Sequence, residues 1–138
     1  MHGGGNTSCK TNMKDLHGRD TEVLCIKGSG WDLGTIEESG LPAVRLAPLT
    51  ELFALTKLSD EDMINVQRSS LMDQASPNPS VETLLHAFLP HKFIDHTHAT
   101  PFLSLANLIR SSKIFIIIYL LIIKFLVSPR FLPLPYNL

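Results

Sequence analysis

The alternation of apolar and polar residues predicts strands in the first third of the chain. Residues 21–26 form a β-rich run, and residues 8–13 before it are a possible strand. Between them, residues 14–20 carry the polar residues and the glycine of a turn, so the pattern predicts a hairpin. A further short strand is expected around Val44 and Leu46.

Residues with helical spacing and helix-capping signals follow. A first helix is expected from Pro48 through Leu58. Ser59 is a good N-cap, and the acidic residues after it complement the dipole of a second helix. That helix should run to about Leu71 or Met72.

A third helix is predicted between the N-cap Ser80 and the closing Pro90. Its apolar residues recur at i, i+3, i+4 and i+7, the stripe of a short amphipathic helix. They are Val81, Leu84, Leu85 and Phe88. Glu82 lies off this stripe in the first turn, where exposed N–H groups favour an anion. Together, hairpin, helices and a last strand over residues 92–98 predict layered α/β structure with a largely antiparallel sheet.

The candidate chemistry lies in the last predicted strand. Because strand side chains alternate between faces, His96 and His98 should point the same way, about 6.6 to 7 Å apart, and could grip one metal ion. Such a pair alone is more often an ordinary pair of strand histidines, and Glu82 alone could be a solvated helix start. The glycines around Ser29 and Gly30 suit a loop that brings N–H groups close to an anion, or simply a turn.

Composition divides the 138-residue chain. Before Pro101 there are thirteen acidic and eight basic residues, whereas from Pro101 onward there are four basic residues and no acidic one. The formal net charge of −1 and the lack of a basic stripe argue against nucleic acid as a partner. Cys9 and Cys25 match no CxxC motif, and no signal pattern opens the chain, so reduced thiols and a cytoplasmic location are expected.

Four ordered motifs, GGGNTS, KGSGWDLGTI, LSDEDM and PNPSVETLLHAFLPHKFIDHTHA, resemble the class II aldolase/adducin family. The sequence is most similar to the aldolase half of bifunctional rhamnulose-1-phosphate aldolase/short-chain dehydrogenase proteins. The resemblance covers residues 3–100, so residues 1–100 are expected to form a partial domain of this family, truncated at both ends.

The resemblance implies zinc-dependent retro-aldol cleavage of a ketose 1-phosphate, such as rhamnulose 1-phosphate, to dihydroxyacetone phosphate and an aldehyde. By the same resemblance, His96 and His98 are zinc ligands and Glu82 transfers the proton. It also implies a homo-oligomer for the full-length relative. The positions that match the family's phosphate-binding loops are Asn6, Thr7, Ser29, Gly30 and Ser80.

One departure from the family pattern concerns the third zinc-binding histidine. No His, Asp, Glu or Cys follows His98, so we expect weak zinc binding and weak or no activity. The alternative function is a non-catalytic, adducin-like interaction module.

The last segment, residues 101–138, is expected to be an apolar, helix-like tail. Residues 114–127 are apolar on every side, which is consistent with a marginal membrane span or with mistranslated sequence. The abrupt change of composition favours the second interpretation, with coding continuity ending near Thr100 to Arg110. A genuine span would tether the protein to a membrane.

Overall fold

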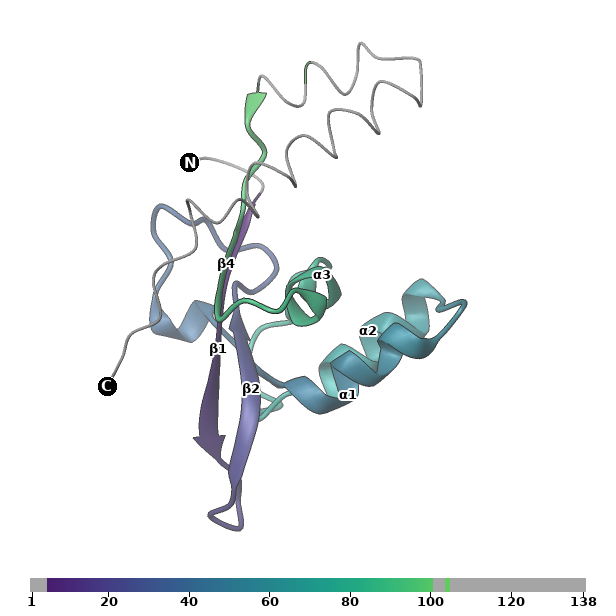
Figure 1. Ribbon diagram of the computed structural model, residues 1–138. Coiled ribbons are helices and arrows are strands. Elements are labelled where there is room, and N and C mark those ends of the chain that lie inside the picture. The colour runs from purple at the N-terminus through teal and green to yellow at the C-terminus, as the bar shows by residue number, and fades with distance from the viewer. Residues whose placement is uncertain (1–4, 101–103, 105–138) are drawn as a thin grey trace, which may run out of the picture. The chain divides into compact units, whose positions relative to one another are not determined.

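A four-stranded antiparallel sheet organises the part of the chain that the computed structural model describes, residues 5–100 and 104. Its strands are β1 (Asn6–Lys14), β2 (Asp20–Ile26), β3 (Ala43–Arg45) and β4 (Phe93–His96). They lie in the order β3-β2-β1-β4 (Figure 1). The two longest strands are therefore central, and the shorter β3 and β4 flank them.

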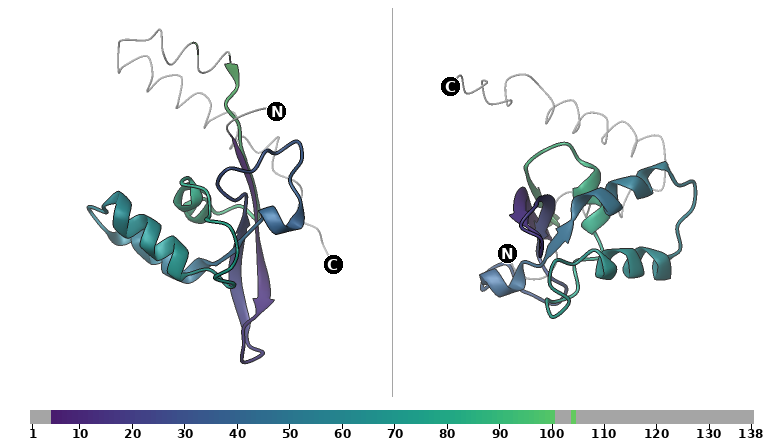
Figure 2. Two further views of the ribbon diagram at one scale, coloured as in Figure 1. Left: turned by 180° about the vertical axis from the view of Figure 1, so that it is seen from behind. Right: turned by 90° about the horizontal axis from the view of Figure 1, so that it is seen from below.

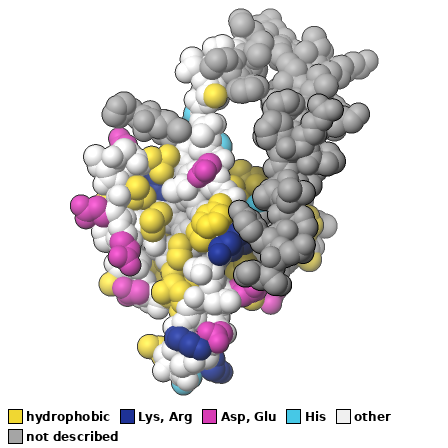
Figure 3. All heavy atoms as spheres, turned by 60° about the vertical axis from the view of Figure 1, so that its left-hand side comes forward, with side chains coloured by type: hydrophobic (Ala, Val, Ile, Leu, Met, Phe, Trp, Pro, Cys, Tyr) yellow, Lys and Arg dark blue, Asp and Glu magenta, His cyan; other side chains and the backbone are white. Residues whose placement is uncertain are grey.

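The predicted hairpin is confirmed by the pairing of β1 with β2. At its turn, Asp15 Oδ1 accepts hydrogen bonds from the backbone N–H groups of His17 and Arg19, at 2.8 and 2.9 Å. Ion pairs join Arg19 to Asp15 and Lys14 to Asp20. Figure 3 shows basic and acidic side chains gathered at this lower end, with hydrophobic side chains above them. Because the side chains of Lys14, Arg19 and Asp20 are 64–72% exposed, these ion pairs contribute little stability.

The helices are short and lie together on one side of the sheet (Figures 1 and 2). The α-helices are α1 (Leu46–Glu51), α2 (Asp60–Ser69) and α3 (Thr83–Phe88). Two 3-10 turns accompany them, η1 (Glu38–Gly40) between β2 and β3, and η2 (Leu52–Ala54) after α1. The predicted cap of α2 is confirmed, because Ser59 Oγ accepts the N–H of Asp62 at 3.1 Å.

The first two predicted helices end earlier than their sequence patterns indicated. The helix expected to reach Leu58 has ended by Ala54, since η2 is followed by extended backbone. Helix α2 ends at Ser69, short of Leu71 and Met72. Those two residues extend the sheet instead: Leu71 forms a bridge with Val44, and the Met72 N–H donates to the carbonyl of Ala43 at 2.9 Å.

The start predicted for the third helix was also wrong. Ser80 is not its N-cap, because the Ser80 N–H donates to the Lys27 carbonyl at 3.2 Å and Pro79 forms a bridge with Gly28. These extended contacts delay the helix, and Glu82 becomes its N-cap. The predicted apolar stripe is only partly buried: Val81 is 66% exposed, while the buried residues of α3 are Thr83, His86 and Ala87.

The hydrophobic core fills the space between the sheet and the helices. Leu24 and Ile26 of β2 point to the same face, and Val44 of β3 is the register partner of Leu24. Burying one such aliphatic side chain contributes about 1.5–3 kcal/mol. The buried core cluster is Leu24, Ile26, Val44, Leu49, Leu71 and Ala87.

Strand β4 is shorter than predicted, because it ends at His96 and leaves His98 outside the sheet. Its register partner at this end is Asn6, the first residue of β1. Gly5, just before, has a φ of +89°, and a Cβ there would come within 2.6 Å of the His96 carbonyl oxygen. The turn at Gly5 and the end of β4 therefore coincide.

The predicted apolar tail, residues 101–138, lies outside the described residues except for Ser104. Within the described part of the chain, no helix has the length and apolarity to cross a membrane. Chain contacts divide the molecule after Thr97, and the fold given above is that of the first unit.

Candidate metal and catalytic site

Three segments that are distant in sequence meet at one end of the sheet. The Lys27 N–H donates to the carbonyl of Thr7 at 3.1 Å, and the Ser80 N–H donates to the carbonyl of Lys27 at 3.2 Å. The Ser29 N–H donates to the carbonyl of Asn78 at 2.8 Å. Backbone hydrogen bonds therefore tie the start of β1, the loop after β2 and the approach to α3 into one framework.

The side chain of Glu82 contacts two of the neighbouring strands, β1 and β4, through Asn6 and His96. Its Oε2 atom lies 3.1 Å from Nδ1 of His96 and also accepts a hydrogen bond from the side-chain amide of Asn6. Asn6 is only 4% exposed, and its position opposite His96 in the β1–β4 register puts both side chains on the face toward α3. The carboxylate is thus oriented by a buried donor.

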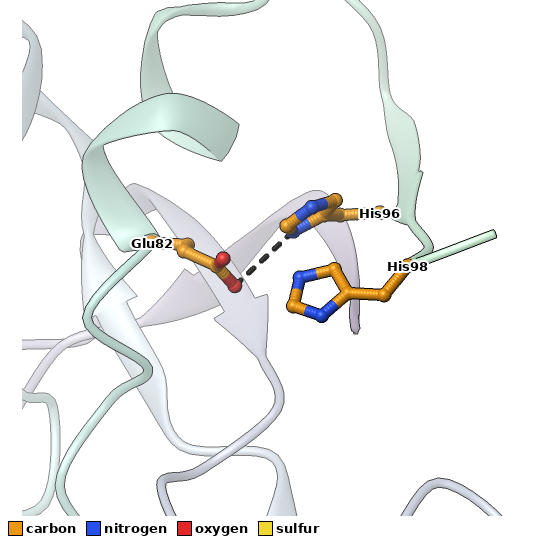
Figure 4. A group of neighbouring side chains, drawn as sticks. All are labelled: Glu82, His96 and His98. Atoms are coloured by element: carbon orange, nitrogen blue, oxygen red, sulfur yellow. Dashed lines mark ion pairs between the residues drawn. The ribbon is translucent and has the colours of Figure 1, made fainter. Parts of the chain in front are cut away.

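His98 brings a third donor to the same place. One ligand atom each from Glu82, His96 and His98 lies within 4.8 Å of the others, and Figure 4 shows the three side chains directed toward one another. Donors that share a tetrahedral zinc at bond lengths of about 2.0–2.2 Å are about 3.4 Å apart. Two imidazoles and a carboxylate suit zinc chemically. The separations, 3.1 Å between Glu82 and His96 and at most 4.8 Å within the group, lie on both sides of that value, so the residues fit this metal.

The candidate phosphate-binding residues occupy different surroundings. Ser80 is 7% exposed, and its Oγ accepts the N–H of Glu82 at 3.3 Å. Ser29 and Gly30 lie in the exposed loop after β2. Thr7, by contrast, points to the opposite face of the sheet from Asn6, where its hydroxyl donates to Asp95 at 2.7 Å.

A cavity of about 200 Å³ lies beside Ser29 and contains groups that the sequence patterns did not single out. Gln67 of α2 lines it and is only 2% exposed. Arg68, the next residue, donates from Nη1 to Oδ1 of Asn78 at 2.5 Å. The loop after β2 is therefore flanked by a cationic side chain that no motif marked.

Behind the candidate ligands, His86 is fully buried against β1. Its Nδ1 lies 2.7 Å from the hydroxyl of Ser8. Burial lowers the pKa of His86 below its usual range, and the neighbouring His96 lowers it further, so the ring is neutral at pH 7. The contact with Ser8 anchors α3 to the sheet.

Lys10 fixes the other end of α3. Its ammonium group donates to the carbonyls of Ala87, at 3.0 Å, and Leu89, where the helix ends. A cation at this position satisfies free carbonyls and complements the helix dipole. Asn6, Ser8 and Lys10 alternate along one face of β1, and this polar alternation is the signal by which their shared role could have been found.

Known proteins resemble the chain over most of its length. A family model described as the Class II Aldolase and Adducin N-terminal domain matches residues 1–125. The Uncharacterized oxidoreductase YuxG of Bacillus subtilis (strain 168) is 44% identical over 103 residues, which are 75% of this chain and 15% of that protein.

A solved structure shows the same relationship. It is the N-terminal class II aldolase domain of a conserved protein from Thermoplasma acidophilum, with 45% identity and a TM-score of 0.73. The match covers 76% of this chain and 49% of that one, so the chain spans well under two thirds of either relative. The family match and the solved structure agree with the motifs, and the chain belongs to the class II aldolase and adducin N-terminal domain family.

Proposed function

We propose that this domain carries out metal-dependent aldol cleavage of a ketose 1-phosphate, such as rhamnulose 1-phosphate, to dihydroxyacetone phosphate and an aldehyde. The observation that carries the proposal is the convergence of Glu82 with His96 and His98. A pure interaction module has no chemical need for a carboxylate 3.1 Å from an imidazole that could bind a metal.

His96 and His98 would hold zinc, and their neutral imidazoles leave most of its positive charge available to the substrate. Bound there, zinc would supply the Lewis-acid stabilisation needed where negative charge develops on the substrate oxygens. Without substrate, the carboxylate of Glu82 would be the third donor to the metal. We assign this carboxylate to proton transfer during the reaction.

Glu82 would accept the proton of the hydroxyl group that becomes the aldehyde oxygen. As that O–H bond breaks, a C=O bond forms and the adjacent C–C bond breaks, leaving its electron pair on the three-carbon enediolate. The carbon that received the electron pair then takes up the proton that Glu82 accepted, which gives dihydroxyacetone phosphate and restores the carboxylate. Asn6 supports this role, because its amide hydrogen bond to Oε2 fixes the direction of the carboxylate.

The substrate phosphate would be bound by hydrogen-bond donors in fixed positions, and no bond would be made or broken there. Asn6, Ser29, Gly30 and Ser80 lie on the three segments that the backbone hydrogen bonds tie together. Thr7 would contribute through its backbone, since its hydroxyl is engaged by Asp95 on the other face.

The direct test combines zinc analysis with aldehyde release from rhamnulose 1-phosphate, using the purified 138-residue chain. We expect zinc to bind and turnover to be slow, because the chain supplies two imidazoles where the family pattern has three. Chelation should abolish aldehyde release, and added zinc should restore it. A protein that stays free of zinc would overturn the proposal, and a zinc-loaded protein without any cleavage would favour the adducin-like interaction module.

We further infer that the functional counterpart is the aldolase half of a bifunctional rhamnulose-1-phosphate aldolase/dehydrogenase. The name of the Bacillus relative, an oxidoreductase, and the 15% of its length that is matched support a larger protein with a second activity. Comparing rhamnulose 1-phosphate with fuculose 1-phosphate tests the substrate. Faster cleavage of fuculose 1-phosphate would contradict this assignment.

A further inference from the structure

The two cysteines of the chain lie directly opposite each other in the sheet. Cys9 of β1 and Cys25 of β2 are register partners, although fifteen residues separate them in sequence. Because paired residues of adjacent strands project to the same face, both thiols are on one side of the hairpin. The sequence spacing, which matches no redox motif, concealed this juxtaposition.

The hydrogen-bond pattern fixes the kind of pair that they form. The Lys27 N–H donates to Thr7, which makes Thr7 and Lys27 a hydrogen-bonded pair. Such pairs alternate along an antiparallel ladder, so Cys9 and Cys25, two positions further along, are again a hydrogen-bonded pair. Their Cα atoms are therefore about 5.5 Å apart, within the range of about 4.4–6.8 Å that a disulfide spans.

Both thiols are free and half-buried. The Cys9 Sγ–H contacts its neighbouring carbonyl on Lys10 at 3.5 Å. Burial raises the pKa of the Cys25 thiol, and the proximity of Cys9 raises it further, which is consistent with the two sulfur atoms facing each other. The raised pKa leaves Cys25 little thiolate at neutral pH, so we assign it the second step of a reaction at this place.

We propose that Cys9 and Cys25 form a cross-strand dithiol site that low-molecular-weight disulfides, such as oxidised glutathione, convert into an intramolecular disulfide. The Cys9 thiolate attacks one sulfur of glutathione disulfide, forming a mixed disulfide and releasing one glutathione thiolate. Cys25 then loses its proton and attacks the Cys9 sulfur, which releases the second glutathione. Two protein thiols are oxidised, and one disulfide is reduced to two thiols.

The geometry also makes this disulfide easy to reduce. Hydrogen-bonded pairs hold their side chains further apart than the other pairs of an antiparallel ladder. Closing the S–S bond must therefore bring the two Cβ atoms closer than the ladder holds them, from up to about 5.5 Å to about 3.5–4.5 Å, and such strain makes a disulfide more reducible. The site is suited to reversible modification more than to permanent cross-linking.

The site is separate from the proposed aldolase chemistry. Cys9 lies on the face of β1 opposite Asn6 and Ser8, so neither thiol reaches Glu82. The modification does, however, join β1 and β2 close to the loop that begins at Lys27. It can be measured whether or not the protein cleaves a sugar phosphate.

The test treats the folded 138-residue chain with oxidised glutathione, blocks remaining thiols with an alkylating reagent and measures the intact mass. We expect the loss of two hydrogen atoms, no bound glutathione and no alkylation. Dithiothreitol should restore both thiols. The folded protein should form the bond faster than the same protein in urea, because the sheet holds the sulfurs together.

Single variants separate the two steps. Cys25→Ser should stop at one glutathione bound to Cys9, and Cys9→Ser should react more slowly, since the raised pKa of Cys25 leaves little thiolate. The proposal is overturned if folded wild-type protein accumulates bound glutathione without the internal bond. It is equally overturned if the bond forms only in urea.

Discussion

Glu82 and His96 are joined at 3.1 Å, carboxylate Oε2 to imidazole Nδ1, although one precedes helix α3 and the other ends strand β4. The link depends on the sheet, because His96 is positioned by its pairing with Asn6, and Asn6 also donates to Glu82. Asn6 and His96, which lie near opposite ends of the domain sequence, therefore both orient the carboxylate of Glu82. Changes at either end should affect the same site.

Replacing Glu82 with Gln tests its proposed role in proton transfer. Glutamine preserves the size and the contact with Asn6 but cannot carry the proton. We expect the rate of aldehyde release per bound zinc to fall by about 10² to 10⁴, as for the loss of a general acid or base. Zinc content is measured in parallel, because Glu82 is also one of the three candidate donors. Glu61→Gln, at an exposed site in α2, is the matched control and should keep the wild-type rate. An unchanged rate in Glu82→Gln would leave the residue a structural role only.

Replacing His96 with Ala should remove zinc, because it deletes one of the two imidazoles in the candidate metal group of the described residues. Equilibrium dialysis followed by metal analysis measures the effect without depending on activity. His91→Ala is the control, since His91 is exposed in the loop before β4. If both variants retain the same zinc as wild type, the metal is bound elsewhere.

Replacing Gly5 with alanine should lower the free energy of unfolding by more than the size of one methyl group indicates. Gly5→Ala would place Cβ 2.6 Å from the His96 carbonyl oxygen, in a backbone conformation with φ of +89°. Strain of this kind costs about 1–3 kcal/mol, which urea unfolding should reveal together with weaker zinc binding.

Gly18→Ala provides the control for Gly5→Ala. It also has positive φ, at +76°, but nothing lies within 4 Å of the added Cβ. It should therefore be less destabilising and leave zinc binding intact. Equal losses in the two variants would show that the His96 contact is unimportant.

His86 should make stability depend on pH. Burial lowers its pKa in the folded protein, so the unfolded state binds a proton more readily. Its contribution is complete above the unfolded pKa of about 6.5 and is lost as the pH falls below that value. We expect the urea midpoint to drop between about pH 7 and pH 5, and to drop less in His86→Gln. The exposed His91→Gln should keep the wild-type slope, and an identical slope in all three proteins would contradict the assignment.

Local signals in the sequence were enough to predict the hairpin and the start of α2. The turn from Lys14 to Asp20 and the Ser59 cap depend on neighbouring residues, whose chemistry is visible in the sequence. The layered α/β class and the antiparallel sheet followed from the order of these elements.

The limits of α3 could not be predicted in the same way. The apolar spacing of Val81 and Leu85 suggested a buried stripe, yet the face that packs inward carries His86 and Thr83. Those polar groups are buried because Ser8 contacts His86 and the Ser80 carbonyl accepts the Thr83 hydroxyl at 2.5 Å. The first of these partners depends on strand register, which no local pattern reveals.

For the candidate site, residue types were predictable but their connections were not. The motifs marked Glu82, His96 and His98, and the structure brings them together. The same motifs grouped Asn6 with Thr7, whereas strand alternation sends their side chains to opposite faces. The side-chain hydrogen bond from Asn6 to Glu82 is seen only once the chain is folded.

The pairing of β1 with β4 also sets an order of events during folding. Thr7 and Asp95 are 88 positions apart, whereas the β1–β2 hairpin closes through a short turn. Each doubling of a closed loop adds about 0.6 kcal/mol of entropic cost, and contacts between distant residues slow folding. The hairpin can therefore form early, while the Glu82–His96 geometry waits for the last strand. During synthesis, the two imidazoles of the proposed metal site would come together only after nearly the whole described domain has emerged.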